Sequence, residues 1–208
     1  MLLAFDTATP LVSVALHDGS RVVVELSSSQ PMKHGEQLAP LIEQALDQTW
    51  IKRTDLTGIA VGVGPGPFTG LRVGLVTART LGFVLGIPVY GVCSLDVIAA
   101  EAASGSPFTV ATDARRKEVY RASYDGSGVR VAGPDVLRPA DAATDQPVAG
   151  EGAVLYPEAF PRAFGPARPS AGWLATIVVE RRAEILDPEP LYLRRPDAVI
   201  PSAPKSVS

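Results

Sequence analysis

The sequence predicts a duplicated α/β protein, and two observations support that prediction. When the chain is aligned with itself at an offset of 107 residues, nine of the 23 positions in residues 2–24 are identical. Common residues at roughly 5–10% each would give about one or two matches by chance. After the first copy, apolar runs of strand length alternate with helical patterns, which is typical of an α/β lobe. The alternatives are a coincidental offset or two ordinary hairpins. The identical pairs are Ala4/Ala111, Asp6/Asp113, Val12/Val119, Ala15/Ala122, Asp18/Asp125, Gly19/Gly126, Ser20/Ser127, Val22/Val129 and Val24/Val131.

Each copy begins with an apolar strand that ends on an aspartate, Asp6 in the first copy and Asp113 in the second. A β-rich run follows and reaches an Asp-Gly step, which favours a hairpin turn because glycine tolerates positive φ. A third extended run completes an antiparallel meander. The predicted strands are Leu2–Phe5, Leu11–Leu16 and Arg21–Leu26 in the first copy, and Thr109–Thr112, Glu118–Tyr124 and Val129–Val131 in the second.

The rest of the first half alternates between helices and strands. A helix is predicted over His34–Thr49, because its apolar residues recur at helical spacing on one face. A glycine-proline loop then leads from a strand into a long apolar helix that ends near Gly86. The apolar set of the first helix is Leu38, Leu41, Ile42, Ala45 and Leu46. The remaining predicted elements are strands at Gly58–Val63 and Pro88–Val92 and a helix at Ser94–Ala103.

The second half is harder to interpret. Residues 126–170 are rich in Gly, Pro and Ala and show weak periodicity. A helix is predicted over Ala171–Leu186, followed by a short extended segment. The Ser-Gly-Ser-Pro stretch after residue 103 predicts a boundary between an N-terminal lobe, residues 1–104, and a smaller C-terminal lobe, residues 105–195. The last residues, 196–208, are expected to form a disordered tail.

Composition excludes several classes of protein. The net charge of −3 lacks the basic excess of a dedicated nucleic-acid binder. One cysteine and two histidines leave little for a disulfide or a metal cage. The opening MLLAFDTATP has no basic region before an apolar core, so no secretory signal is expected. The apolar stretch Leu71–Tyr90 contains Arg72 and Arg79 and is interpreted as a buried helix and strand start. A cytoplasmic protein without membrane contact is predicted.

The glycine-rich loop GVGPGPFTGLRVGL, residues 62–75, has two interpretations. Backbone N–H groups at a helix start can bind phosphate. However, a Walker lysine is missing, and prolines at 65 and 67 remove two donors. A rigid turn that allows close packing is favoured. The following helix repeats small residues every fourth position, which predicts a smooth stripe for a neighbouring helix of this chain or another subunit. The stripe is Gly70, Gly74, Ala78, Gly82 and Gly86.

Several polar residues are candidates for a nucleotide site. Asp6 and Asp113, at equivalent strand ends, could hold a magnesium ion, with Thr7 and Thr9 near a phosphate. The alternative is that the aspartates form Asx turns. Ser94 precedes a helix and is predicted to be its N-cap. The basic run 115–117 is interpreted as a charged hairpin turn, with an RNA or acidic-partner contact as the alternative.

Five segments resemble the TsaB (YeaZ) family, a bacterial subunit of the system that makes threonylcarbamoyladenosine in tRNA. The resemblance covers nearly the whole chain and is most specific in residues 1–120. The family usually has serine where this chain has Pro67. The segments are LLAFDTATPLVSVAL at 2–16, GPGPFTGLRVGL at 64–75, GVCSLDVIA at 91–99, TDARRKEVY at 112–120 and PLYLR at 190–194.

The resemblance implies a duplicated actin-like, sugar-kinase-like (ASKHA) two-lobe α/β fold with mixed sheets flanked by helices. It also implies relation to TsaD, the catalytic paralogue, which binds a metal through two histidines four residues apart. Ser94 and Ile98 stand at the corresponding place and cannot form that pair. The chain is therefore predicted to have kept the fold and lost the active site, with no metal and no catalytic residue.

The predicted function is a non-catalytic scaffold that pairs with TsaD through the helices at 34–49 and 69–86. TsaE is the implied further partner, tRNA contact is expected only within the complex, and a homodimer is expected to be feasible in isolation. A nucleotide at the partner interface stays an open alternative. A bulky residue at Gly74 or Ala78 is expected to abolish pairing without unfolding the chain. The rival is a nucleotide-dependent phosphotransferase or ATPase that acts alone. The predicted contact residues are His34, Leu38, Leu41, Ile42, Ala45, Gly70, Leu71, Gly74, Leu75, Ala78 and Gly82.

Overall fold

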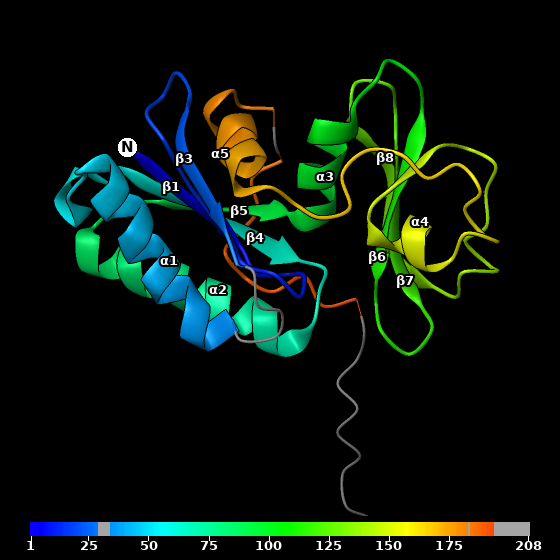
Figure 1. The fold of residues 1–208 in the computed structure, drawn as a ribbon, viewed down its shortest axis with the longest axis horizontal. Coiled ribbons are helices and arrows are strands. Elements are labelled where there is room, and N and C mark those ends of the chain that lie inside the picture. Colours follow the sequence, from blue (N-terminus) through cyan, green and yellow to red (C-terminus); the bar gives the residue numbers. More distant parts are fainter. Residues whose placement is uncertain (29–33, 183, 194–208) are drawn as a thin grey trace, which may run out of the picture.

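Two β-sheets organise residues 1–28, 34–182 and 184–193, which are the residues described by the structure, a computed structural model (Figure 1). The first sheet has the strand order β3-β2-β1-β4-β5 and the second has the order β8-β7-β6-β9. The predicted disordered tail, 196–208, lies outside the described residues. The strands are β1 (Leu2–Asp6), β2 (Ser13–His17), β3 (Val22–Ser27), β4 (Gly58–Gly64), β5 (Val89–Cys93), β6 (Phe108–Asp113), β7 (Val119–Tyr124), β8 (Arg130–Leu137) and β9 (Val148–Ala149).

The two sheets share one topology, which confirms the predicted duplication. In each, an antiparallel meander is extended by a fourth strand that runs parallel to the first, β4 beside β1 and β9 beside β6. The turns also match. The Asp18 carboxylate accepts a 2.7 Å hydrogen bond from the amide of Ser20, and the Asp125 carboxylate accepts one of 2.9 Å from the amide of Ser127. The sequence identities therefore correspond to a repeated structure.

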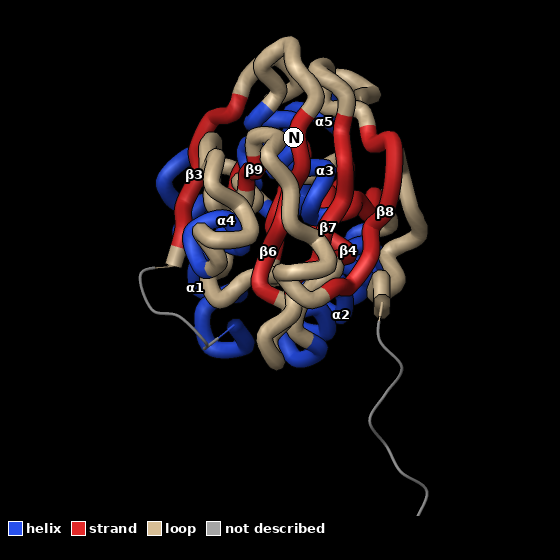
Figure 2. The backbone as a smooth tube through the Cα atoms, turned by 90° about the vertical axis from the view of Figure 1, so that its right-hand side faces the viewer, coloured by secondary structure: helices blue, strands red, loops and turns tan. Residues whose placement is uncertain are grey.

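Helices cover both faces of the first sheet. On one face lie α1 (His34–Thr49) and α2 (Phe68–Leu85), and on the other lie α3 (Ser94–Ala102) and α5 (Ala171–Val179). Alternate residues of β1 serve the two faces, since Leu3 packs towards α1 and α2 and Leu2 packs towards α5. Figure 1 shows α3 between the sheets, where it also packs on β6 and β7, the strands that face the viewer in Figure 2. The remaining helices are the short α4 (Glu151–Leu155) and a 3₁₀ turn at Arg53–Asp55.

The C-terminal part of the chain returns to the first sheet. Helix α5 packs on β1 and β2, although it follows the second sheet in sequence. The backbones of Gly91 and Leu186 then exchange two hydrogen bonds of 3.0 and 2.8 Å, and the amide of Leu191 donates to the carbonyl of Val63 at 2.9 Å. The range assigned to the C-terminal lobe, 105–195, thus includes a helix and an extended segment that pack on the N-terminal sheet.

Two predicted elements differ from the structure. The helix predicted over Ala171–Leu186 ends at Val179, because Arg181 takes the left-handed conformation with φ of 56° and closes the helix. The strand predicted at Val129–Val131 is instead β8, which runs to Leu137. Residues 126–170, in which sequence periodicity was weak, contain the rest of β8 together with β9 and α4.

Candidate functional site

Asp6, at the end of β1, is a buried acid of the first lobe. Its side chain is 1% exposed. The carboxylate accepts hydrogen bonds from the Ala8 amide at 2.7 Å and the Ser94 hydroxyl at 2.6 Å. Gly62 of β4 lies directly against it, since a Cβ added there would be 1.8 Å from Oδ2 of Asp6. The carboxylate is therefore enclosed by its own chain, as the Asx-turn interpretation predicts.

Ser94 has a different role from the predicted helix cap. The N-cap position of α3 is occupied by Cys93, whose side chain makes no capping hydrogen bond. The Ser94 hydroxyl instead donates to Asp6 and accepts from the amide of Gly64 at 3.3 Å. Burial raises the pKa of Asp6 above its ordinary value, while the hydrogen bonds from Ser94 and Ala8 oppose that shift. The prediction that Ser94 is the N-cap was wrong, because local residue spacing contains no information about a hydrogen-bond partner that is 88 residues away.

The two threonines near Asp6 are also engaged within the chain. The Thr7 hydroxyl donates to the Gly70 carbonyl at 2.8 Å, and the Thr9 hydroxyl donates to the Leu11 carbonyl at 3.1 Å. The ring of His34 contacts the Thr9 carbonyl through Nε2 at 2.6 Å. His34 is only 8% exposed, so it fixes the start of α1 to this loop and does not offer a contact to a partner.

Asp113 occupies the equivalent position at the end of β6. Its carboxylate accepts a hydrogen bond from the Arg115 amide at 2.8 Å and forms an ion pair with the Arg115 guanidinium at 3.2 Å. Between Asp113 and the loop at Thr9 the lobes leave a cavity of about 10 Å³, enough for at most one water molecule. Within the described residues, no three His, Cys, Asp or Glu side chains cluster as metal ligands. This cavity is therefore far smaller than a nucleotide.

The glycine-proline loop between β4 and α2 packs on the first hairpin. A Cβ at Gly66 would be 2.3 Å from the Ala8 carbonyl oxygen, so only glycine fits there. Helix α2 begins after Pro67, which has neither an N–H to donate nor a capping side chain. These contacts support the rigid-turn interpretation of the loop over phosphate binding.

Three glycines of the small-residue stripe of α2 lie against the chain's own first sheet and the residue that follows β1, and Gly70 also faces the ring of His34 at the start of α1. A Cβ at Gly70 would be 2.4 Å from the Thr7 carbonyl oxygen, and one at Gly74 would be 2.4 Å from the Thr7 hydroxyl. At Gly82 it would be 2.4 Å from the side chain of Val89. The stripe therefore lets α2 lie close to β1 and β5. A bulky residue at Gly74 is expected to destabilise the chain itself, contrary to the sequence-based expectation.

The apolar face of α1 and α2 is likewise part of the core. The predicted contact residues on this face are buried between the helices and the first sheet, with Leu41 only partly buried. In the isolated chain they therefore pack on its own first sheet, and their contact with a partner stays a prediction. Periodicity identified the apolar side of each helix correctly but not its neighbour. The fully buried members are Leu38, Ile42, Ala45, Leu71, Leu75 and Ala78.

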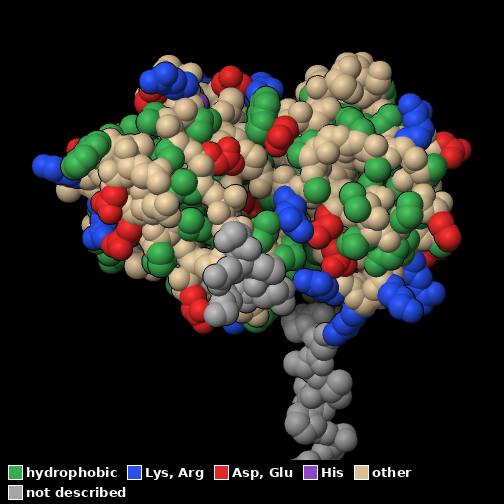
Figure 3. Space-filling model, in the orientation of Figure 1, with side chains coloured by type: hydrophobic (Ala, Val, Ile, Leu, Met, Phe, Trp, Pro, Cys, Tyr) green, Lys and Arg blue, Asp and Glu red, His purple; other side chains and the backbone are tan. Residues whose placement is uncertain are grey.

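The outer face of α2 carries the residues that sequence reasoning missed. Val76, Phe83 and Val84 lie at helical spacing and are 62%, 89% and 71% exposed. The signal was that apolar residues lie on nearly every side of this helix, whose length and apolar composition also match a membrane span. Arg72 and Arg79 interrupt the face. In Figure 3, hydrophobic side chains alternate with charged ones over the part of the surface that carries α1 and α2.

The C-terminal segment packs on the start of α2 through an aromatic contact. The ring of Phe68 stacks on Tyr192 with centroids 5.5 Å apart, and the guanidinium of Arg72 lies 3.9 Å from the Phe68 centroid. Further along, Arg79 pairs with Glu189 at 2.7 Å. The C-terminal segment is thus held against α2, so part of this helix is covered while the end that carries Phe83 stays open.

Comparisons with known proteins agree with this architecture. The family model described as TsaD, tRNA N6-adenosine threonylcarbamoyltransferase, matches residues 23–171. An uncharacterized protein of Mycobacterium tuberculosis (strain ATCC 25618 / H37Rv) is 42% identical over 207 residues, which cover 95% of this chain and 93% of that protein. The Escherichia coli (strain K12) tRNA threonylcarbamoyladenosine biosynthesis protein TsaB is 35% identical over 133 residues, which cover 62% of this chain and 57% of that protein.

A solved structure has a similar fold. The crystal structure of a Pseudomonas aeruginosa protein, described as uncharacterized with similarity to peptidase YEAZ, has a TM-score of 0.78 and 30% identity. It covers 93% of this chain and 99% of that one. The doubled meander and these matches define a duplicated α/β protein with mixed sheets flanked by helices, as the sequence predicted. Within that class, the chain belongs to the TsaB (YeaZ) family.

Proposed function

We propose that this chain is a non-catalytic accessory subunit in the biosynthesis of threonylcarbamoyladenosine in tRNA. The observation that carries the proposal is the enclosed state of Asp6. The acid at the end of β1, which was the candidate for a nucleotide site, accepts hydrogen bonds from Ser94 and Ala8 and is covered by Gly62. The name of the related Escherichia coli protein supplies the pathway. A family member without a usable acid of its own would act through a partner.

The partner we propose is a TsaD-type transferase, bound through the outer face of α2. Val76, Phe83 and Val84 form an exposed apolar row on a helix whose other side is fixed to the sheet. Exposed apolar residues grouped in this way are typical of protein interaction sites. TsaE, an ATPase, would join this pair, and tRNA would contact the chain only in the assembly. The same row would allow self-association when the partner is absent, and the assembly would work in the cytoplasm.

The interface is tested with a double variant, Val76→Glu with Phe83→Glu. Both side chains point to solvent in the isolated chain, so two charges there should leave the fold intact and abolish co-purification with TsaD. The matched control is Val154→Glu, which changes an equally exposed residue on α4 (70%) in the other lobe and should pair normally. Sizing chromatography of each variant with TsaD gives the result. Pairing that survives the double variant would contradict the proposed interface.

The rival function is a nucleotide-dependent phosphotransferase or ATPase acting alone. The small cavity at Asp113 and the engaged Asp6 argue against it. Titration calorimetry of the isolated chain with ATP and Mg²⁺ separates the two, since tight binding with turnover would support the enzyme. A serine peptidase has less support, because Ser94 hydrogen bonds Asp6 while His34 contacts a backbone carbonyl.

A further inference from the structure

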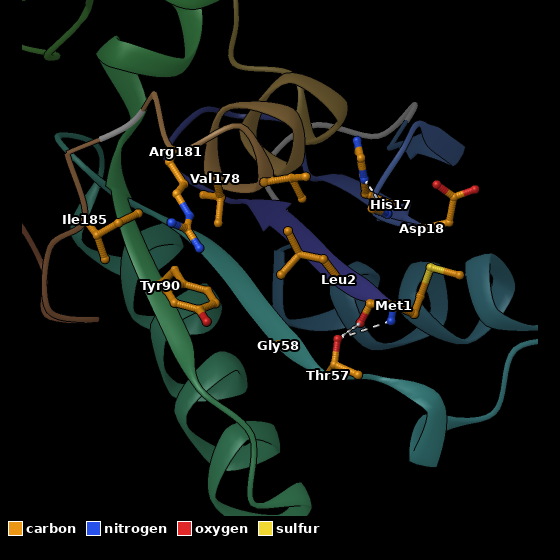
Figure 4. A pocket seen from close by; sticks show the side chains of 12 residues that line it. Met1, Leu2, His17, Asp18, Thr57, Gly58, Tyr90, Val178, Arg181 and Ile185 are labelled. Atoms are coloured by element: carbon orange, nitrogen blue, oxygen red, sulfur yellow. Dashed lines mark hydrogen bonds between the residues drawn. The ribbon is translucent and has the colours of Figure 1, made fainter.

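A cavity of about 540 Å³ opens at the edge of the first sheet where β1 and β4 begin (Figure 4). It lies beside the C-terminal end of α5 and takes no part in the features described above. Leu2, Tyr90, Val178 and Ile185 line it with apolar surface, and Arg181 and His17 supply polar groups. Its volume is within the range of about 300–1,000 Å³ that is usual for small-molecule sites, and so is its mainly apolar lining.

Arg181 is placed at the cavity by the way α5 ends. The amide of Arg182 donates to the carbonyl of Ile177 at 2.9 Å, and the amide of Arg181 donates to that of Val178 at 3.2 Å. These are the two bonds of a Schellman motif, whose left-handed residue is most often glycine. Here that residue is Arg181, with φ of 56°. Figure 4 shows its side chain reaching from the helix end into the cavity, towards Tyr90.

The charge of Arg181 is not compensated at this site. In the part of the chain that the structure describes, its guanidinium has no hydrogen bond or ion pair. Asp18 is the one acidic side chain among the lining residues, but its carboxylate accepts from the amides of Ser20 and Arg21 in its own turn. In Figure 4 that carboxylate points away from Arg181. The Met1 ammonium also lines the cavity, but it donates to the Asp55 carbonyl and the Thr57 hydroxyl. A mainly apolar cavity with one unengaged guanidinium favours a ligand that carries a single negative charge.

His17 adds a donor at the other side. Its Nδ1 accepts a hydrogen bond from the Gly19 amide at 3.0 Å, so in the neutral ring Nε2 carries the proton. The side chain is 3% exposed and held in place by that bond. A bound acid would therefore meet the Arg181 guanidinium at one end of the cavity and the His17 ring at the other, with apolar walls between them.

We propose that this cavity binds a small monocarboxylic acid with an aromatic or aliphatic body. The guanidinium of Arg181 pairs with the carboxylate in the two-pronged geometry that suits these groups. The ring of Tyr90, with Leu2, Val178 and Ile185, contacts the body of the ligand. A phosphate dianion fits less well, because the other cation of the lining, the Met1 ammonium, already donates to the Asp55 carbonyl and the Thr57 hydroxyl, which leaves one free guanidinium for two negative charges. The site is separate from the outer face of α2 and does not depend on the proposed subunit function.

The test uses phenylacetate, indole-3-acetate and 1-naphthylacetate as probes of the full chain, by calorimetry and by amide NMR shifts. Saturable binding of at least one acid is expected, with shifts at Gly58 and Tyr90 and at least tenfold weaker binding of the matching amide. 1-Naphthyl phosphate should also bind more weakly than the acid. Failure of all three acids, or equal affinity for acid and amide, would overturn the proposal. Tighter binding of 1-naphthyl phosphate than of 1-naphthylacetate would overturn the assignment of a singly charged ligand.

The variant that isolates the guanidinium is Arg181→Gly. Glycine suits the left-handed backbone, so this variant should fold at least as well as the parent, yet bind the acid at least tenfold more weakly. The matched control is Trp50→Gly, which makes the same kind of change at the left-handed end of α1, away from the cavity. It should leave acid binding unchanged. Equal acid binding by Arg181→Gly and the parent would refute the role of Arg181.

Discussion

Ser94 and Asp6 are joined by a buried 2.6 Å hydrogen bond across 88 residues of sequence. The bond ties the end of the first strand to the first turn of α3, the helix between the two sheets. It occupies the acid that marks the first copy of the repeat. In the second copy, Asp113 keeps the same backbone turn but is paired with Arg115. Of the two repeated aspartates, Asp6 links β1 to α3 through Ser94, whereas Asp113 is bonded within the turn that follows β6.

The burial of Asp6 predicts a pH dependence of stability. Because desolvation raises its pKa in the folded state above the ordinary 3.8, the folded chain binds this proton more tightly than the unfolded chain does. The contribution of Asp6 to the free energy of unfolding is most favourable below pH 3.8. It is lost as the pH rises through the pKa that Asp6 has in the folded state. Urea denaturation should show Asp6→Asn gaining stability relative to the parent as pH rises from about 4. A difference that does not change with pH would contradict the burial effect.

The contact of α2 with β1 predicts that Gly70→Ala destabilises the isolated chain. The added Cβ would meet the Thr7 carbonyl oxygen at 2.4 Å, and backbone cannot rotate away. Overpacking costs about 1–3 kcal/mol, whereas alanine gains at most about 1 kcal/mol in helix propensity. The matched control is Gly35→Ala in α1, where the new Cβ would find its nearest neighbour at 4.0 Å. The midpoint of urea denaturation should fall for Gly70→Ala and should be unchanged or higher for Gly35→Ala.

Local sequence patterns predicted the first half of the fold well. The helix at His34–Thr49 has the observed bounds, and both repeated aspartates lie at strand ends. Those features depend on periodicity and turn chemistry within short windows. The second half was less predictable because α5 is nearly all apolar, and its end depends on Arg181 in a conformation that sequence seldom assigns to arginine.

The candidate site was less predictable because its main contacts are long-range. Asp6 was identified as a notable acid, but its enclosure depends on Gly62 and Ser94, which come from other elements. The apolar faces of α1 and α2 were also identified. Whether such a face packs on the same chain or on a partner is decided by the sheet beneath it, and a single helical pattern contains no information about that sheet.

The end of α1 predicts a stabilising substitution. Trp50 has φ of 58° and is 92% exposed, and the amide of Ile51 bonds to the Leu46 carbonyl at 3.1 Å in a Schellman motif. A left-handed conformation costs a non-glycine residue roughly 1–2 kcal/mol. Trp50→Gly should therefore raise the free energy of unfolding by about 1 kcal/mol, after the greater freedom of glycine in the unfolded chain is subtracted. A lowered urea midpoint would show that the exposed indole packs favourably.

Cys93, the single cysteine, predicts slow thiol chemistry in the folded chain. It is fully buried, and burial, with a smaller effect of the Asp96 charge, raises its pKa from 9.0 to about 12. At pH 8 the thiolate fraction should then be about a thousandfold lower than for a free cysteine. Labelling with a chromogenic disulfide should therefore follow unfolding and accelerate with urea in step with the loss of structure. Rapid labelling without urea, at a rate that urea does not change, would mean that β5 and the start of α3 open to solvent in the native state.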